Sequence, residues 1–172
     1  MLQLNIILHP TDFSENSRGA LKVAHSLARD HKARLLLISV VDPPPTDIFF
    51  VSEPLIATGS ATSHELHGAK EKIAHMAASI TDIPVETEVV VGQPADVIID
   101  AAENRNADLI VMGTHGRTGV AHLLMGSIAE CVMRRAECPV LTIRPGTAKH
   151  LGNVIPSEIV SSTRSVEESA IV

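Results

Sequence analysis

The fold is decided by residues 2–41, LQLNIILHPTDFSENSRGALKVAHSLARDHKARLLLISVV. Its two ends, 2–9 and 34–41, are short apolar runs typical of strands covered on both faces. Between them Ser14 can cap a helix, because it precedes apolar residues that recur every three or four positions. A strand, a helix and a second strand in this order predict a parallel pair joined by a right-handed crossover.

The same alternation continues along the chain. We predict further strands at 85–91, 108–112 and 139–144, and further helices at 63–80, 95–104 and 127–136. The fold class is therefore α/β: a single-domain, open, twisted five-stranded parallel sheet with helices on both faces, Rossmann-like in type. We expect one domain over 1–145 and a peripheral tail over 146–172. In such sheets ligands bind beyond the carboxyl ends of the strands, where the strand order reverses.

Composition argues against several classes of function. The 172 residues carry 14 Lys plus Arg against 20 Asp plus Glu, a net charge of -6, and only 2% are aromatic. This balance predicts no nucleic-acid partner. No apolar run reaches the length of about 18 residues that spans a bilayer, so we expect no membrane insertion and a cytoplasmic protein. Cys131 and Cys138 are too few for a disulfide framework and are expected to be structural.

A glycine-rich loop follows the 108–112 strand. It reads Gly113-Thr-His-Gly116-Arg-Thr-Gly119, and Gly126-Ser127 stands at the next helix start. Glycines allow close backbone approach and positive φ, while a helix N-terminus directs N–H groups at an anion. The loop therefore suits a phosphate chain, although it is neither a Walker A loop nor a Rossmann fingerprint. A plain sharp strand-to-helix connection is the alternative.

The spacing Gly113-x2-Gly116-x9-Gly126-Ser127 resembles that of the nucleotide-binding universal stress proteins. Four more segments resemble this family in the same order, and the likeness covers about 4–144. The resemblance implies an adenine nucleotide alpha hydrolase-like fold. The four segments are HPTDFS at 9–14, VVD at 40–42, VGQP at 91–94 and CPV at 138–140.

The resemblance also implies a site for ATP, or for AMP or ADP. Asp12 and Val40 would hold the adenosine end, with Pro10 and Thr11 at the same mouth. Mg or Mn would bind through the phosphates, with no protein metal site. Asp12 has an alternative role in an Asx turn or helix cap, and a loop His or Arg is usually solvated. The residues beside ribose and phosphates would be Met112, Gly113, Thr114, His115, Gly116 and Arg117, followed by Gly126, Ser127 and Ile128 at the phosphate chain.

The sequence favours a binding module over an enzyme. No residues form a general base beside an oriented nucleophile, so we expect slow ATP hydrolysis at most. The family resemblance implies a stress-response or regulatory module with a protein partner, and a homodimer through Val140, Leu141, Thr142 and Ile143 of an unpaired edge strand. The alternatives are a dimeric scaffold that binds no nucleotide and a small nucleotide-handling enzyme. The tail has three open roles: capping that edge, wrapping the partner or remaining disordered.

Overall fold

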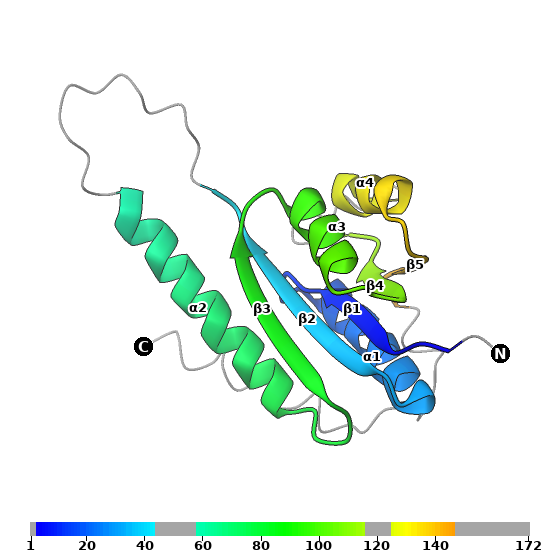
Figure 1. The fold of residues 1–172 in the computed structure, drawn as a ribbon. Helices are drawn as coiled ribbons and strands as arrows, with labels where there is room; N and C mark the ends of the chain where they lie inside the picture. Colours follow the sequence, from blue (N-terminus) through cyan, green and yellow to red (C-terminus); the bar gives the residue numbers. More distant parts are fainter. Residues whose placement is uncertain (1–2, 44–57, 116–124, 147–172) are drawn as a thin grey trace, which may run out of the picture.

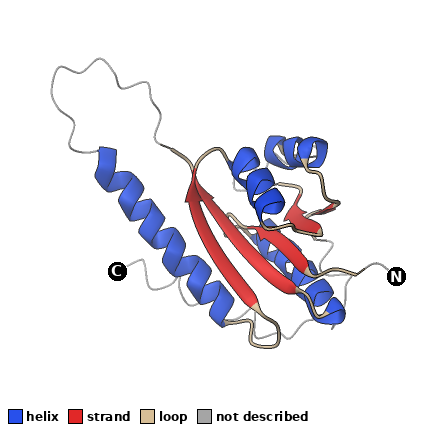
Figure 2. Cartoon of the chain, viewed as in Figure 1, coloured by secondary structure: helices blue, strands red, loops and turns tan. Residues whose placement is uncertain are grey.

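The computed structural model describes residues 3–43, 58–115 and 125–146. Within them, five strands alternate with four helices, as predicted (Figures 1 and 2). The elements are β1 (Ile6–Pro10), α1 (Glu15–His31), β2 (Arg34–Val41), α2 (Thr58–Ala78), β3 (Val85–Val91), α3 (Pro94–Asn104), β4 (Leu109–Gly113), α4 (Ser127–Arg135) and β5 (Val140–Ile143).

All five strands are parallel and lie in the order β3-β2-β1-β4-β5, which confirms the predicted sheet. The central strand is β1, where Ile7 pairs with Leu35 of β2 on one side and with Leu109 of β4 on the other. The chain first builds outward from β1 to β3 and then crosses to the opposite side. The strand order therefore reverses between β1 and β4.

Side chains alternate between the two faces of the sheet. Ile7 and Val111 pack with α1 and α2, while Leu8 and Ile110 pack with α3 and α4, and all four are completely buried. Figure 1 shows these helix pairs on opposite sides of the strands. Each such side chain stabilises the fold by about 1.5–3 kcal/mol relative to its exposed state. Aliphatic residues supply almost the whole core, as the scarcity of aromatic residues predicts.

The start of β1 differs from the predicted strand at 2–9. The strand begins at Ile6, where a side chain at the end of the α3–β4 connection takes the N–H groups of Asn5 and Ile6. Asp108 Oδ2 accepts hydrogen bonds from Asn5 N at 2.6 Å and from Ile6 N at 2.9 Å. These bonds lower the pKa of Asp108 below its ordinary value. A hydrogen bond between residues 103 positions apart in the sequence thus sets where the central strand starts.

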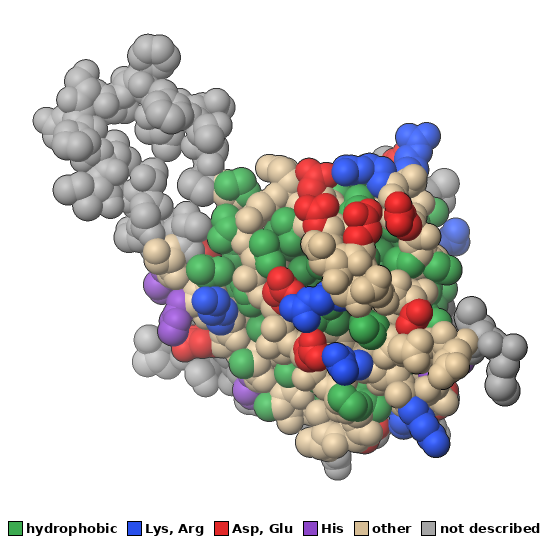
Figure 3. All heavy atoms as spheres, in the orientation of Figure 1, with side chains coloured by type: hydrophobic (Ala, Val, Ile, Leu, Met, Phe, Trp, Pro, Cys, Tyr) green, Lys and Arg blue, Asp and Glu red, His purple; other side chains and the backbone are tan. Residues whose placement is uncertain are grey.

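Charged side chains of both signs are interspersed on the face shown in Figure 3. On β3, Glu86 and Glu88 accept hydrogen bonds from Arg105 at 3.2 and 3.0 Å, and Glu86 also accepts one from Arg34 at 2.7 Å. All of these side chains are partly exposed to solvent, so each pair contributes little stability. They do leave the backbone edge of β3 flanked by charge, which discourages pairing with another sheet.

Candidate functional site

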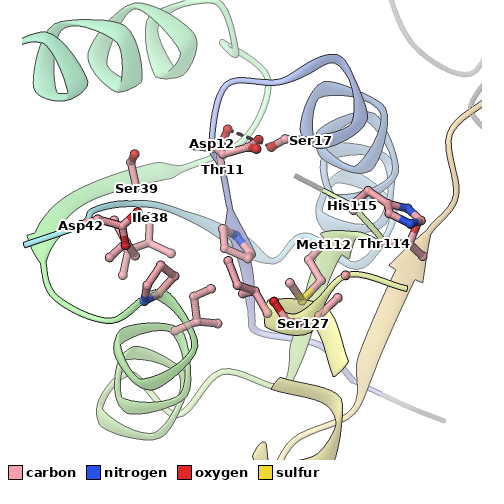
Figure 4. Close-up of a pocket in the computed structure, with 18 residues that line it drawn as sticks. Thr11, Asp12, Ser17, Ile38, Ser39, Asp42, Met112, Thr114, His115 and Ser127 are labelled. Atoms are coloured by element: carbon pink, nitrogen blue, oxygen red, sulfur yellow. Dashed lines mark hydrogen bonds between the residues drawn. The ribbon is translucent and has the colours of Figure 1, made fainter. Parts of the chain in front are cut away.

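A cavity of about 300 Å3 opens at the carboxyl ends of β1, β2 and β4, where the strand order reverses (Figure 4). The first turns of α1, α3 and α4 complete its wall. Its size lies at the lower end of the range for small-molecule sites. It is lined by Pro10, Thr11, Asp12, Ser17, Ile38, Ser39, Val40, Asp42, Pro94, Ile98, Met112, Gly113, Thr114, His115, Gly126, Ser127, Ile128 and Ala129.

The structure places at the cavity every residue predicted for the nucleotide site that it describes. Gly116 and Arg117 lie outside the described residues. The residues predicted for a nucleotide site and found on the cavity wall are Pro10, Thr11, Asp12, Val40, Met112, Gly113, Thr114, His115, Gly126, Ser127 and Ile128.

Sequence analysis missed several lining residues, notably Ser17, Ser39 and Ile98. A signal for Ser17 was present, since it shares the buried stripe of α1 with Ala20 and Leu21. A hydroxyl on an otherwise apolar buried stripe needs a polar partner. The same reasoning applies to Ser39, which is 3% exposed in the buried strand β2.

The β1 side of the cavity is held by local hydrogen bonds. Asp12 Oδ1 accepts from Ser14 N at 3.0 Å and from Ser14 Oγ at 2.6 Å, so the Asx turn weighed above is present. Ser14 Oγ accepts in turn from Ser17 N and caps α1. Asp12 thus stabilises the turn and also lines the cavity.

Phe13, between these residues, has a left-handed backbone with φ 65. A bulky side chain in this conformation costs roughly 1–2 kcal/mol. The neighbouring hydrogen bonds hold it there, because Thr11 Oγ1 accepts from Phe13 N at 3.1 Å. Its ring lies 5.8 Å from Lys72 Nζ of α2, a cation–π contact. The hydrogen bond to Thr11 and the contact with Lys72 together hold the strained turn, which keeps Asp12 at the cavity.

Behind this wall lies His9, which is 0% exposed. Its Nδ1 is 2.8 Å from Val111 O, and its Nε2 is 3.4 Å from Ser17 Oγ. Ser17 Oγ also lies 2.9 Å from Thr11 Oγ1 (Figure 4). Burial lowers the pKa of His9 from 6.5 to about 4, so the imidazole is neutral at pH 7.

The β4 side of the cavity has a different construction. Gly126 precedes α4 with φ -76, and without a side chain it makes no capping hydrogen bond. Its N–H donates to Thr114 O at 2.7 Å. Thr114 Oγ1 lies 3.0 Å from His115 Nδ1. The first turn of α4 therefore presents backbone N–H groups and the positive end of the helix dipole at the cavity, and no side-chain cap covers them.

The two described glycines of this side do not use positive φ, which corrects that part of our expectation. Close approach of backbone atoms disfavours a side chain at both positions instead. A Cβ on Gly113 would lie 3.3 Å from Asn16 O of α1, and one on Gly126 would lie 3.2 Å from Thr114 O. Both contacts are tighter than most side chains experience, and both involve backbone atoms.

Residues of the kind that serve metal or thiol chemistry are also present in the described ranges 3–43, 58–115 and 125–146. No three His, Cys, Asp or Glu residues gather there as metal ligands. His67 is exposed and paired with Glu71 at 3.2 Å, as expected for a solvated helix face. Cys131 and Cys138 are both unpaired thiols of intermediate burial. Among the described helices, none is both long and apolar enough to cross a membrane.

Comparison with known proteins gives a consistent family assignment. A model of the universal stress protein family matches residues 4–144. Universal stress protein MJ0531 of Methanocaldococcus jannaschii is 39% identical over 142 residues, which cover 80% of this chain and 81% of the relative. The structure of universal stress protein UspA from Lactobacillus plantarum superposes with a TM-score of 0.72 at 27% identity, covering 84% of this chain and 100% of the other.

A solved universal stress protein in complex with cAMP is also similar. Its TM-score is 0.57 at 26% identity, and the match covers 83% of this chain and 98% of the other. At least one protein with this fold thus binds an adenine nucleotide.

Proposed function

Because the chain belongs to the universal stress protein family, we propose that it binds an adenine nucleotide, ATP or else AMP or ADP, in the cavity at the carboxyl end of its sheet. The observation that carries this proposal is that the two sides of the cavity differ in polarity. Asp12 lies on the β1 side, and the open N-terminus of α4 lies on the other. A nucleotide has a sugar that donates hydrogen bonds and phosphates that accept them, and it matches this polarity.

The apolar part of the cavity supports a place for the base. Val40 of β2, Ile98 of α3 and Met112 of β4 all belong to or pack against the same apolar cluster, and all line the cavity. Such surface binds a planar base by burial and dispersion and needs no aromatic stacking partner. The phosphates would then extend toward Gly126 and Ser127.

A divalent ion is compatible with this arrangement. Since the described residues hold no cluster of metal ligands, Mg or Mn would be bound mainly by the phosphates and water. Because the sequence shows no general base paired with an oriented nucleophile, we expect any ATP hydrolysis to be slower than about 1 per second. The nucleotide would act as a regulatory ligand that changes the surface offered to a protein partner of the stress response in the cytoplasm.

We also propose a homodimer through β5. This strand ends the sheet, and its residue Leu141 is 37% exposed. Val140 and Thr142 are half-buried, while Ile143 is 7% exposed and packs in its own core, so Ile143 would support the contact from behind. Antiparallel pairing of two such edges would satisfy both backbone rows. Sedimentation velocity tests this, and a monomer at every concentration would contradict it.

Residues 1–145 would form the nucleotide-binding unit, and the tail over 146–172 would be peripheral to it. The competing proposal is a dimeric scaffold that binds no nucleotide. Freshly purified protein separates the two: it is denatured, its nucleotides are identified by chromatography, and the emptied protein is titrated with ATP in a calorimeter with and without Mg. Co-purified adenine nucleotide or micromolar ATP affinity supports the site. Empty protein that ignores ATP supports the scaffold.

A further inference from the structure

Phe13 directly follows two residues of the cavity wall, Thr11 and Asp12, and has a backbone conformation that bulky residues rarely adopt. Its φ is 65, in the left-handed region. Such strain persists only where surrounding contacts hold it, and it gathers at ligand sites and switch regions. The contacts that hold Phe13 therefore show what would release it.

The first restraint on Phe13 is a set of hydrogen bonds to acceptor atoms of the cavity wall, where Thr11 and Asp12 lie together (Figure 4). Thr11 Oγ1 accepts from Phe13 N at 3.1 Å and from Ser17 Oγ at 2.9 Å, so both lone pairs of that hydroxyl are occupied. Asp12 Oδ1 accepts from Ser14 N at 3.0 Å and from Ser14 Oγ at 2.6 Å. The longest of these four bonds is the one from Phe13 N. A ligand group that donates to Thr11 would displace that bond first.

The second restraint is the contact of the Phe13 ring with α2. The ring packs against the core cluster that contains Leu21 of α1 and Ile73 of α2. It also lies 5.8 Å from Nζ of Lys72, an exposed residue of α2 that does not line the cavity. Phe13 is thus bound through its backbone to the cavity wall and through its ring to α2. A change at one contact is felt at the other.

We propose that Phe13 couples the cavity to α2: a nucleotide that donates a hydrogen bond to Thr11 releases the strained turn and withdraws the ring from Lys72, which changes the α2 surface that a partner meets. This inference rests on the proposed function and deepens it, because it assigns the part of the surface that reports nucleotide occupancy. An adenine nucleotide carries suitable donors on its base and its sugar. A ligand shifts such an equilibrium only by binding one state better, and the released turn is the state that frees an acceptor for it.

The coupling must act in both directions. The contact between Phe13 and Lys72 stabilises the strained, ligand-free turn, so its removal favours the released turn and tightens ATP binding. In Lys72→Met, ATP affinity should rise about two- to fivefold, the worth of an exposed cation–π contact. Loss of a positive charge would by itself weaken the binding of an anion. The sign of the effect therefore separates coupling from simple electrostatics.

Titration calorimetry with ATP measures this effect against two matched variants. Lys70→Met makes the same chemical change at another exposed position of α2 and should leave ATP affinity unchanged. Phe13→Leu keeps an apolar side chain and removes the ring, so Lys72→Met should have no effect in that background. Unchanged or weaker ATP binding in Lys72→Met overturns the inference. Equal tightening in Lys70→Met, or in the Phe13→Leu background, overturns it as well.

NMR of the wild-type protein provides a test that needs no substitution. The ring current of Phe13 shifts the Hε resonances of Lys72 upfield in the ligand-free protein, and saturating ATP should return them toward their ordinary positions. The Hε resonances of Lys70 should not move. If ATP binds in the calorimeter and leaves the Lys72 resonances in place, the inference is wrong and the proposed function stands. If wild-type protein binds no ATP, both are wrong.

Discussion

The N-termini of α1 and α4 both face the cavity, and their first turns are capped in opposite ways. At α1, Ser14 accepts a hydrogen bond from Ser17 N and donates one to Asp12, so the first turn is satisfied by its own chain. At α4, Gly126 provides no side chain for capping. The same helical dipole is thus covered in one place and accessible in the other. The comparison teaches that the cap, more than the presence of a helix, decides where an anion can bind.

The largest expected effect comes from making α4 resemble α1. Gly126→Asp places a favourable helix-capping carboxylate where the phosphates would bind. Its charge repels them, and ATP affinity should fall at least about a hundredfold. Stability should change little, because the cap offsets the tight contact of the new Cβ with Thr114 O at 3.2 Å. Calorimetric titration and urea unfolding measure the two quantities.

Two further variants sharpen this result. Gly126→Ser caps the helix without charge and should weaken ATP binding less, by roughly tenfold. Gly68→Asp on α2 makes the same chemical change where a new Cβ meets nothing within 4 Å, and should leave binding unchanged. If ATP still binds Gly126→Asp with wild-type affinity, α4 is not the phosphate site.

The second effect concerns the β1 side of the cavity and is a dependence of protein stability on pH. The pKa of His9 is about 4 in the folded protein and 6.5 in an ordinary environment. Between these values the unfolded chain binds a proton that the folded chain excludes, so stability falls as pH decreases from 6.5 to 4. The loss amounts to about 3 kcal/mol in total. Urea unfolding at several pH values should show this slope, and His9→Gln should lack that part of it. Identical slopes in both proteins would mean that His9 does not control it.

The third effect removes the cap of α1. Ser14→Ala deletes the acceptor for Ser17 N and the donor to Asp12 Oδ1, and should destabilise the protein by about 1 kcal/mol. Because Ser14 does not line the cavity, ATP affinity should change less than about threefold once the protein is folded. Chemical denaturation and calorimetry at 10 °C provide both values. A large loss of affinity would show that the α1 turn contacts the ligand.

The fourth effect is the converse of the third, because it concerns ATP affinity and not stability. Ser127→Ala removes a hydroxyl from the open first turn of α4 and should lower ATP affinity roughly three- to tenfold. Stability should remain within about 0.5 kcal/mol of wild type, since no described hydrogen bond of that side chain supports the fold. The same two measurements apply. Equal shifts in stability for Ser14→Ala and Ser127→Ala would remove the contrast between the helix ends.

Much of the fold could be predicted from local patterns, because strands buried on both faces are visible as continuous apolar runs. Strand 34–41 was located to the residue, and the parallel sheet with helices on both faces followed from the alternation of elements. The start of β1 could not be located, because Asp108 determines it from 103 residues away. No periodicity reports such a contact.

Most residues that line the cavity were also predictable from the sequence, while the hydrogen bonds and close contacts between them were not. The glycine spacing and the segment around Asp12 identified both walls. The contact of His9 with Val111 joins residues 102 positions apart, and the need for glycine at 113 arises from Asn16 O of another element. These depend on how the helices and strands pack.

The central position of β1 has a consequence for the order of assembly. Its pairing with β2 closes a short loop, whereas its pairing with β4 closes one of roughly a hundred residues and carries a larger entropic cost. The half formed by β1, β2 and β3 can therefore precede the other half. The cavity takes its walls from both halves and exists only after the long loop has closed. A nucleotide would consequently slow unfolding of the finished sheet without accelerating the early steps of folding.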